Sequence, residues 1–163
     1  MKKAIEFKVN GKTRQVFVDP WRVLGEVLRE EMGLMGLKIA CGTGECGACT
    51  ILLDGKPVRS CLLLPMQVRG REILTIEGLA KEDRLHPIQE AFIDYYAVQC
   101  GFCTPGMILT AKALIDDKPD PTEDDVREAL VGNLCRCTGY VKIVDAVLAA
   151  SKAVKDSKQD DGH

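Results

Sequence analysis

The chain has 163 residues, of which 46% are hydrophobic and 28% charged, as in an ordinary globular protein of one or two domains. Its 22 basic and 24 acidic side chains give a formal charge of −2, which argues against a nucleic-acid binder, because that class needs a basic face. No apolar run approaches the roughly 20 residues of a membrane-spanning helix, and the N-terminus lacks the apolar core of a signal peptide. We therefore expect a soluble, cytoplasmic protein.

The N-terminal segment is expected to form a β-hairpin followed by a helix. Apolar and charged residues alternate over residues 5–9, and Asn10-Gly11 predicts a tight turn before a returning strand over residues 16–18. Asp19-Pro20 is predicted to be the N-cap and first residue of a helix. That helix is expected to end near Gly33.

A second hairpin is predicted around Asp54-Gly55, between strands over residues 50–53 and 57–58. The apolar run over residues 73–76 predicts one more strand. The character of the sequence changes near Glu77-Gly78. We therefore expect an α+β protein, with a small mixed β domain over residues 1–77 and a helical domain over residues 78–163.

The second half has the apolar periodicity of four helices. The first of these is predicted to present one apolar face made by Ile88, Ala91, Phe92 and Tyr95. Pro105 is expected in the first turn of the second helix, Thr122 at the N-cap of the third, and Gly132-Asn133 just after it. Residues 143–148 predict the fourth helix, and the polar tail from Ser151 to His163 is expected to fray at its end.

The chain contains eight cysteines but only two histidines, His86 and His163. Cytosolic proteins seldom keep so many thiols as disulfides, because that compartment is reducing, so clustered cysteines there are more often metal ligands. Both histidines are predicted to be solvated residues of ordinary loops or helix starts. The chain therefore offers metal ligation rather than general acid–base chemistry.

The first four cysteines have the C-x4-C-x2-C spacing of plant-type 2Fe-2S proteins, at Cys41, Cys46 and Cys49, followed by Cys61. The glycines between them permit the sharp turns that three converging thiolates need. Zinc also binds four thiolates, although usually from two short C-x2-4-C pairs. Zinc and disulfides therefore remain alternatives to a two-iron cluster.

The last four cysteines form a C-x2-C pair, Cys100 and Cys103, and a C-x-C pair, Cys135 and Cys137. The first pair alone would also suit a redox dithiol or half of a zinc site. The second pair precedes a predicted helix, where amide N–H groups favour an anionic group. Spacing alone does not separate iron from zinc at this site. A neighbouring redox cluster favours iron, because a second cluster can then act as a relay.

Three motifs, CGTGECGACT, QCGFCTPG and GNLCRCTGY, resemble in order and spacing the iron–sulfur small subunit of the molybdenum hydroxylases. This is the family of xanthine dehydrogenase, carbon monoxide dehydrogenase and 4-hydroxybenzoyl-CoA reductase. The resemblance runs from Ile5 to Leu148 and rests on all three cysteine motifs. Ala40, where many members have glycine, is a departure that removes no ligand.

The resemblance implies a β-grasp ferredoxin-like domain followed by a four-helix domain, with one 2Fe-2S cluster in each. By position, the first cluster would be the more exposed one, and the second would lie against a molybdenum subunit. Gln99 and Cys137 match positions that contact the pterin of the molybdenum cofactor. The implied ligands are Cys41, Cys46, Cys49 and Cys61 for the first cluster, and Cys100, Cys103, Cys135 and Cys137 for the second.

The sequence contains neither a molybdenum domain nor a flavin domain, so the resemblance implies separate partner subunits, a large molybdopterin-binding one and commonly a medium FAD-binding one. We expect this chain to relay electrons between the molybdopterin site and FAD or an external acceptor, without turning over substrate itself. A free-standing two-cluster ferredoxin is the alternative, and a zinc-stabilised interaction module is a third. Arg136, between two predicted ligands, is a candidate to offset cluster charge.

Overall fold

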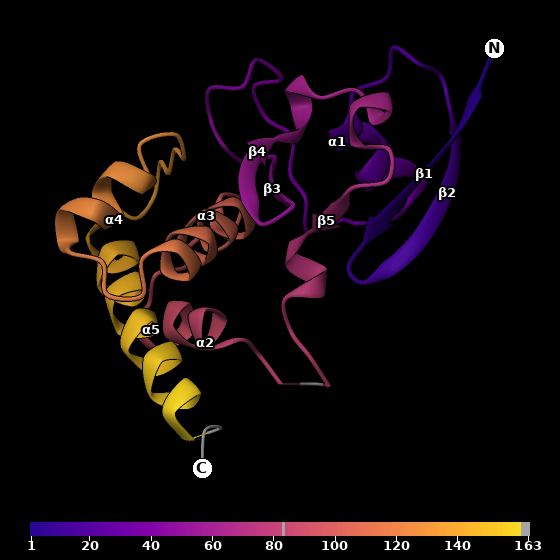
Figure 1. Cartoon of the computed structure of the whole chain (residues 1–163). Coiled ribbons are helices and arrows are strands. Elements are labelled where there is room, and N and C mark those ends of the chain that lie inside the picture. Colours follow the sequence, from indigo (N-terminus) through magenta and orange to yellow (C-terminus); the bar gives the residue numbers. More distant parts are fainter. Residues whose placement is uncertain (83, 161–163) are drawn as a thin grey trace.

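The computed structural model describes residues 1–82 and 84–160, and it forms a sheet domain joined to a helical domain (Figure 1). The five-stranded sheet has the order β2-β1-β5-β3-β4, with β5 parallel to β1 and the other pairs antiparallel. The strands are β1 (Lys3–Val9), β2 (Lys12–Val18), β3 (Thr50–Leu53), β4 (Lys56–Arg59) and β5 (Glu72–Leu74). This is the ferredoxin-like arrangement that the family resemblance implied.

Both predicted hairpins are confirmed. Asn10 and Gly11 have φ values of 50° and 77°, and Asp54 and Gly55 have values of 49° and 80°. Two consecutive residues with positive φ match the right-handed twist of the flanking strands, which is why these dipeptides are hairpin signals. The strand predicted over residues 73–76 is shorter than expected, because Ile76–Gly78 forms the 3-10 turn η4.

A short helix covers the sheet, but it begins later than the sequence predicted. It consists of α1 (Leu24–Glu26) and one π-helical turn, η1 (Val27–Glu31). Asp19 does not cap it, because residues 19–22 form a turn in which the Arg22 amide donates to the Asp19 carbonyl over 3.1 Å. The Leu24 amide donates to the Leu63 carbonyl over 2.7 Å, and this tertiary bond fixes where the helix begins.

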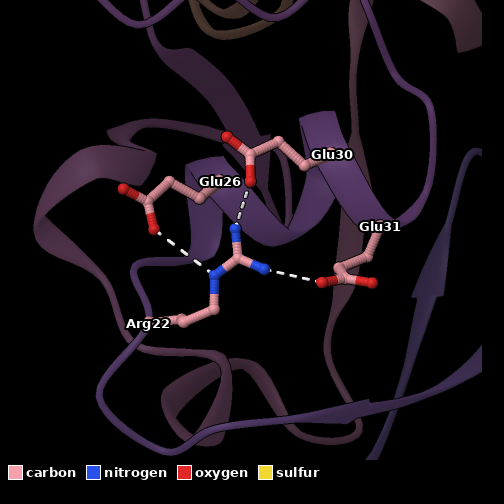
Figure 2. A network of polar contacts seen from close by, with 4 residues as sticks. All are labelled: Arg22, Glu26, Glu30 and Glu31. Carbon is pink, nitrogen blue, oxygen red and sulfur yellow. Dashed lines mark hydrogen bonds and ion pairs between the residues drawn. The ribbon is translucent and has the colours of Figure 1, made fainter.

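The side chain of Arg22 joins that turn to the helix (Figure 2). Its guanidinium points at three carboxylates, with Glu31 at 2.6 Å, Glu26 at 3.5 Å and Glu30 as the third partner. The carboxylates are largely exposed, so water and salt screen these ion pairs. The network orders the start of the helix more than it stabilises the whole domain.

The helical domain has the four predicted helices, α2 (Pro87–Asp94), α3 (Thr104–Asp117), α4 (Glu123–Ala129) and α5 (Val141–Asp160). Thr122 caps α4 as predicted, because its hydroxyl accepts from the Asp125 amide over 3.2 Å. His86 caps α2 through Nδ1, which accepts from the Ile88 amide. Figure 1 shows α3 lying against β3 and β4, so this helix forms part of the contact between the domains.

Two aromatic side chains, Tyr95 and Trp21, differ from expectation. Tyr95 is 43% exposed rather than on the buried face of α2, because the helix ends at Asp94 and Tyr95 is its C-cap. Trp21 is 70% exposed and lies in the turn before α1 instead of in a helix. Tyr140 precedes α5 with a φ of 69°.

Each domain has its own apolar core. Ile5, Phe7 and Leu24 belong to the first, and Ile88, Phe92 and Met107 belong to the second. The polar tail is helical through Asp160, and its predicted frayed end, like His163, lies outside the described residues. Within the described ranges, no helix combines the length and the apolar character needed to span a bilayer.

Candidate metal centres

The first predicted ligand loop, residues 40–49, has no regular secondary structure and turns sharply at its glycines. Gly44 and Gly47 have φ values of 84° and 72°, in the left-handed region where glycine carries no steric penalty. Space is also restricted, because a Cβ on Gly44 would lie 2.5 Å from Leu62 Cδ1, and one on Gly47 would lie 2.3 Å from the Gly132 carbonyl. The loop therefore requires glycine at both positions.

The four predicted thiols of the first set lie at different depths, from the exposed Cys41 through the half-buried Cys46 to the buried Cys49 and Cys61. Cys41 is exposed and accepts from the backbone amides of Thr43 and Cys46 over 3.4 and 3.5 Å. Cys49 and Cys61 are buried, and the Ser60 hydroxyl donates to the Cys49 carbonyl over 2.8 Å, which holds the chain before Cys61 against the loop.

The surroundings of these thiols give them different pKa values. Hydrogen bonds from the Thr43 side chain, and then from Cys46, lower the pKa of Cys41 to about 5. Burial, and then the neighbouring Cys49, raise the pKa of Cys61 to about 11. An exposed loop that donates N–H groups to sulfur is suited to stabilising thiolate ligands.

The second set comes from two loops of the helical domain. Cys100 and Cys103 precede α3, whereas Cys135 and Cys137 lie between α4 and α5. The Cys100 and Cys137 sulfurs are 3.6 Å apart, and both side chains are exposed. The two cysteine pairs, which are more than thirty residues apart in the sequence, therefore meet at one end of the bundle.

Cys103 and Cys135 form the inner pair of this second set. Burial, and then the contact with Cys135, raise the pKa of Cys103 to about 12. Burial acts in the same direction on Cys135, but hydrogen bonds from the Thr138 hydroxyl and amide outweigh it and lower that pKa. The Thr138 Oγ1 lies 3.1 Å from the Cys135 sulfur. Thr138 thus supports the thiolate form of an otherwise poorly solvated cysteine.

The pairing fits a two-iron cluster. Each set contains two neighbouring pairs, and a 2Fe-2S cluster is held by four thiolates, two on each iron. Among the described residues, no group of three Cys, His, Asp or Glu side chains is arranged to hold one metal ion. The Cys100 and Cys137 sulfurs contact each other, and three further thiols have pKa values shifted by a neighbouring cysteine of their own set: Cys41 by Cys46, Cys61 by Cys49 and Cys103 by Cys135.

Sequence reasoning did not foresee that the two ligand loops contact each other directly. The Leu134 amide donates to the Cys46 carbonyl over 2.9 Å. The buried Asn133 side chain donates from Nδ2 to the Gly47 carbonyl over 3.1 Å and accepts from the Thr110 hydroxyl over 3.0 Å. Asn133, expected only to end a helix, therefore also helps to join the domains beside both thiol sets.

Tyr140 was also missed as part of the second site. Its hydroxyl accepts from the Cys135 amide over 2.8 Å, so the ring spans the loop that carries Cys135 and Cys137. The sequence signal available was its place at the end of the C-x-C-T-G-Y motif. Its positive φ, next to Gly139, is what turns the side chain back toward the cysteines.

The remaining predicted residues are exposed. Gln99 precedes Cys100, and Cys100 contacts Cys137, so the two predicted pterin-contacting residues lie at the same exposed end of the helical domain. Arg136 is exposed between its two cysteines. Exposure of this kind leaves Arg136 as a weak counter-charge, because water screens it.

Models of two protein families together cover most of the chain. A 2Fe-2S iron–sulfur cluster binding domain matches residues 7–75, and a 2Fe-2S binding domain matches residues 75–148. The nicotinate dehydrogenase small FeS subunit of Eubacterium barkeri is 48% identical over 143 residues, which are 88% of this chain and 91% of that subunit.

Solved structures agree with these matches. A chain of quinoline 2-oxidoreductase from Pseudomonas putida 86 superimposes with a TM-score of 0.92 at 46% identity, covering 95% of this chain and 97% of that one. The aldehyde oxidoreductase of Desulfovibrio gigas superimposes with a TM-score of 0.91 at 43% identity. The match covers 95% of this chain but 17% of that enzyme, so this fold corresponds to one part of a longer polypeptide there.

Proposed function

Because the chain belongs to the family of iron–sulfur small subunits of molybdenum hydroxylases, and is an electron-transfer subunit with two 2Fe-2S domains, we propose which residues hold each cluster and which partners complete the relay. The family resemblance expected from the three cysteine motifs is confirmed, and so is the pair of cluster domains. The chain is therefore part of an oxidoreductase complex.

Our ligand assignment rests on the pairing of the thiols. The first cluster would be held by the 41–61 set and the second by the 100–137 set, each iron taking one of the four neighbouring pairs. When bound, each cluster takes up and gives up one electron. The division of the domains at residues 77 and 78 is part of the same proposal.

The chain itself supplies the connection between the two sites. The Cys46 carbonyl accepts from the Leu134 amide, and Leu134 is bonded directly to Cys135. One hydrogen bond thus links the backbone of a residue from the first set to that of a residue from the second. Asn133 keeps this link in place from a position that is 2% exposed. We infer that this junction is the shortest bonded route between the two cysteine sets.

We further propose that the partner subunits are a large molybdopterin-binding chain and a medium FAD-binding chain, in the cytoplasm. An exposed apolar stretch leads into the second cysteine set, with Tyr96 81% exposed, Phe102 44% and Val98 40%. Such a stretch beside a redox site favours a docking face for another chain. Gln99 and Cys137, on the same end of the domain, would contact the pterin of the large subunit.

The test is EPR spectroscopy of the dithionite-reduced native protein, with iron counted on the same sample. We expect two distinct S = 1/2 signals and about four irons per chain, the number in two 2Fe-2S clusters. Cys41→Ser should remove one signal and Cys103→Ser the other, because each serine variant removes a ligand from one set only.

Size exclusion of the native extract tests the partners. A subunit should elute in a much larger complex that contains molybdenum, whereas a free-standing ferredoxin would elute as a monomer. A single EPR signal with half of the iron would contradict the assignment of the helical set, and zinc in that site would be the first replacement to consider.

A further inference from the structure

Arg59 occupies the contact between the two cysteine-bearing domains. It is the last residue of β4 and lies two positions before Cys61. Its Nη1 donates to the Thr50 hydroxyl over 3.0 Å, and its Nη2 donates across the domain boundary to the Gly132 carbonyl over 2.6 Å. A Cβ on Gly132 would lie 2.2 Å from Nη2, so the guanidinium fits directly against the other domain.

The charge of Arg59 is poorly compensated by the protein. Both acceptors are neutral, and no carboxylate among the described residues forms an ion pair with this side chain. The Nε atom is buried and has no hydrogen-bond partner among the described residues. A guanidinium does not lose its proton in proteins, so a partly buried one without a counter-ion is unfavourable.

The hydrogen-bond partners of Arg59 lie close in the sequence to predicted ligands. Thr50 follows Cys49, and Gly132 lies three residues before Cys135. Four thiolates, two ferric irons and two sulfides give an oxidised cluster a charge of about −2, which one-electron reduction makes more negative. Two anionic groups on either side of the junction would supply the compensation that no carboxylate supplies.

We propose that Arg59 is a positioning residue that acts as the shared counter-charge of the two clusters, raising both reduction potentials while it holds the domains together. The inference rests on the proposed ligand assignment. A nearby cation stabilises the reduced, more negative state, and a half-buried one is screened less than an exposed one. Arg136, the arginine singled out by sequence, is exposed and so contributes less.

Redox titration with dithionite, monitored by EPR, tests the proposal on the full chain in its native complex. In Arg59→Met we expect the equilibrium constant for one-electron reduction to fall by about tenfold at both clusters, which corresponds to about 59 mV per one-electron couple. Arg59→Lys keeps the charge and should restore most of the potential. Arg14→Met removes the same charge from β2, at the opposite edge of the sheet, and should shift neither potential.

Unchanged potentials in Arg59→Met, with both EPR signals and full iron content present, would overturn the proposal. Equally low potentials in Arg59→Lys and Arg59→Met would also overturn it, because a lysine keeps the charge, so that result would indicate a structural role only. If the unaltered protein itself lacks two clusters, the ligand assignment fails instead, so the two failures are distinguishable.

Discussion

At the scale of single residues, His86 makes the start of the helical domain sensitive to pH. Its Nδ1 accepts from the Ile88 amide over 3.2 Å, and only the neutral imidazole can do this. Burial lowers the pKa of His86, Lys112 and Lys81 act in the same direction, and Asp116 opposes them.

Because the folded-state pKa is lowered, the stability from this cap is present above the unfolded value of about 6.5 and is lost as the pH falls below it. After correction for intrinsic rates, we expect the Ile88 amide to exchange hydrogen faster at pH 5.5 than at pH 7.5. Loss of the cap should lower the stability of this helix start by about 1 kcal/mol at most. His86→Asn keeps a cap that does not titrate and should remove this pH dependence. Identical corrected profiles for the two proteins would contradict the assignment.

At the scale of secondary-structure elements, α3 packs against the first ligand loop through a glycine. Replacing glycine by alanine within a helix usually stabilises it by about 1 kcal/mol. At Gly106, however, a Cβ would lie 2.4 Å from the Gly47 carbonyl, and that oxygen belongs to the loop that carries the first cysteines.

We therefore expect Gly106→Ala to destabilise the protein, by about 1–3 kcal/mol as for other overpacked sites. Thermal unfolding followed by cluster absorbance at matched iron content measures this. Ala113→Gly, in the same helix, should also destabilise, by about 1 kcal/mol from helix propensity alone. A stabilised Gly106→Ala variant would mean that the loop can move away from α3 without loss.

The elements also show what sequence can and cannot predict. The hairpin at Asn10-Gly11 and the cap at Thr122 are set by neighbouring residues, and both were predicted. The start of α1 was not, because a hydrogen bond to Leu63, far along the chain, decides it. The same limit applies to the sites, since spacing identified the cysteines as candidates, whereas the cross-domain contacts of Arg59 with Gly132 and of Asn133 with Gly47 join residues more than seventy positions apart.

At the scale of the whole molecule, the two domains are joined by polar contacts between their ligand loops as well as by the packing of α3 against β3 and β4. Asn133 is central, because its amide donates to the Gly47 carbonyl and accepts from the Thr110 hydroxyl while almost fully buried. Leaving a buried hydroxyl without its acceptor destabilises a protein by about 1–3 kcal/mol. The junction should therefore determine whether the domains unfold together.

Differential scanning calorimetry of the cluster-loaded protein tests this. We expect one transition in the unaltered chain and two in Asn133→Leu, because the variant removes the buried cross-domain hydrogen bond from Asn133 to Gly47 and leaves both apolar cores intact. Thr110→Val combined with Asn133→Leu replaces both partners of the Thr110–Asn133 hydrogen bond by apolar groups of similar shape, and should unfold at a higher temperature than Asn133→Leu alone. A single transition in Asn133→Leu would show that the remaining contacts suffice to couple the domains; these include the packing of α3 against β3 and the bonds from Arg59 to Gly132 and from Leu134 to Cys46.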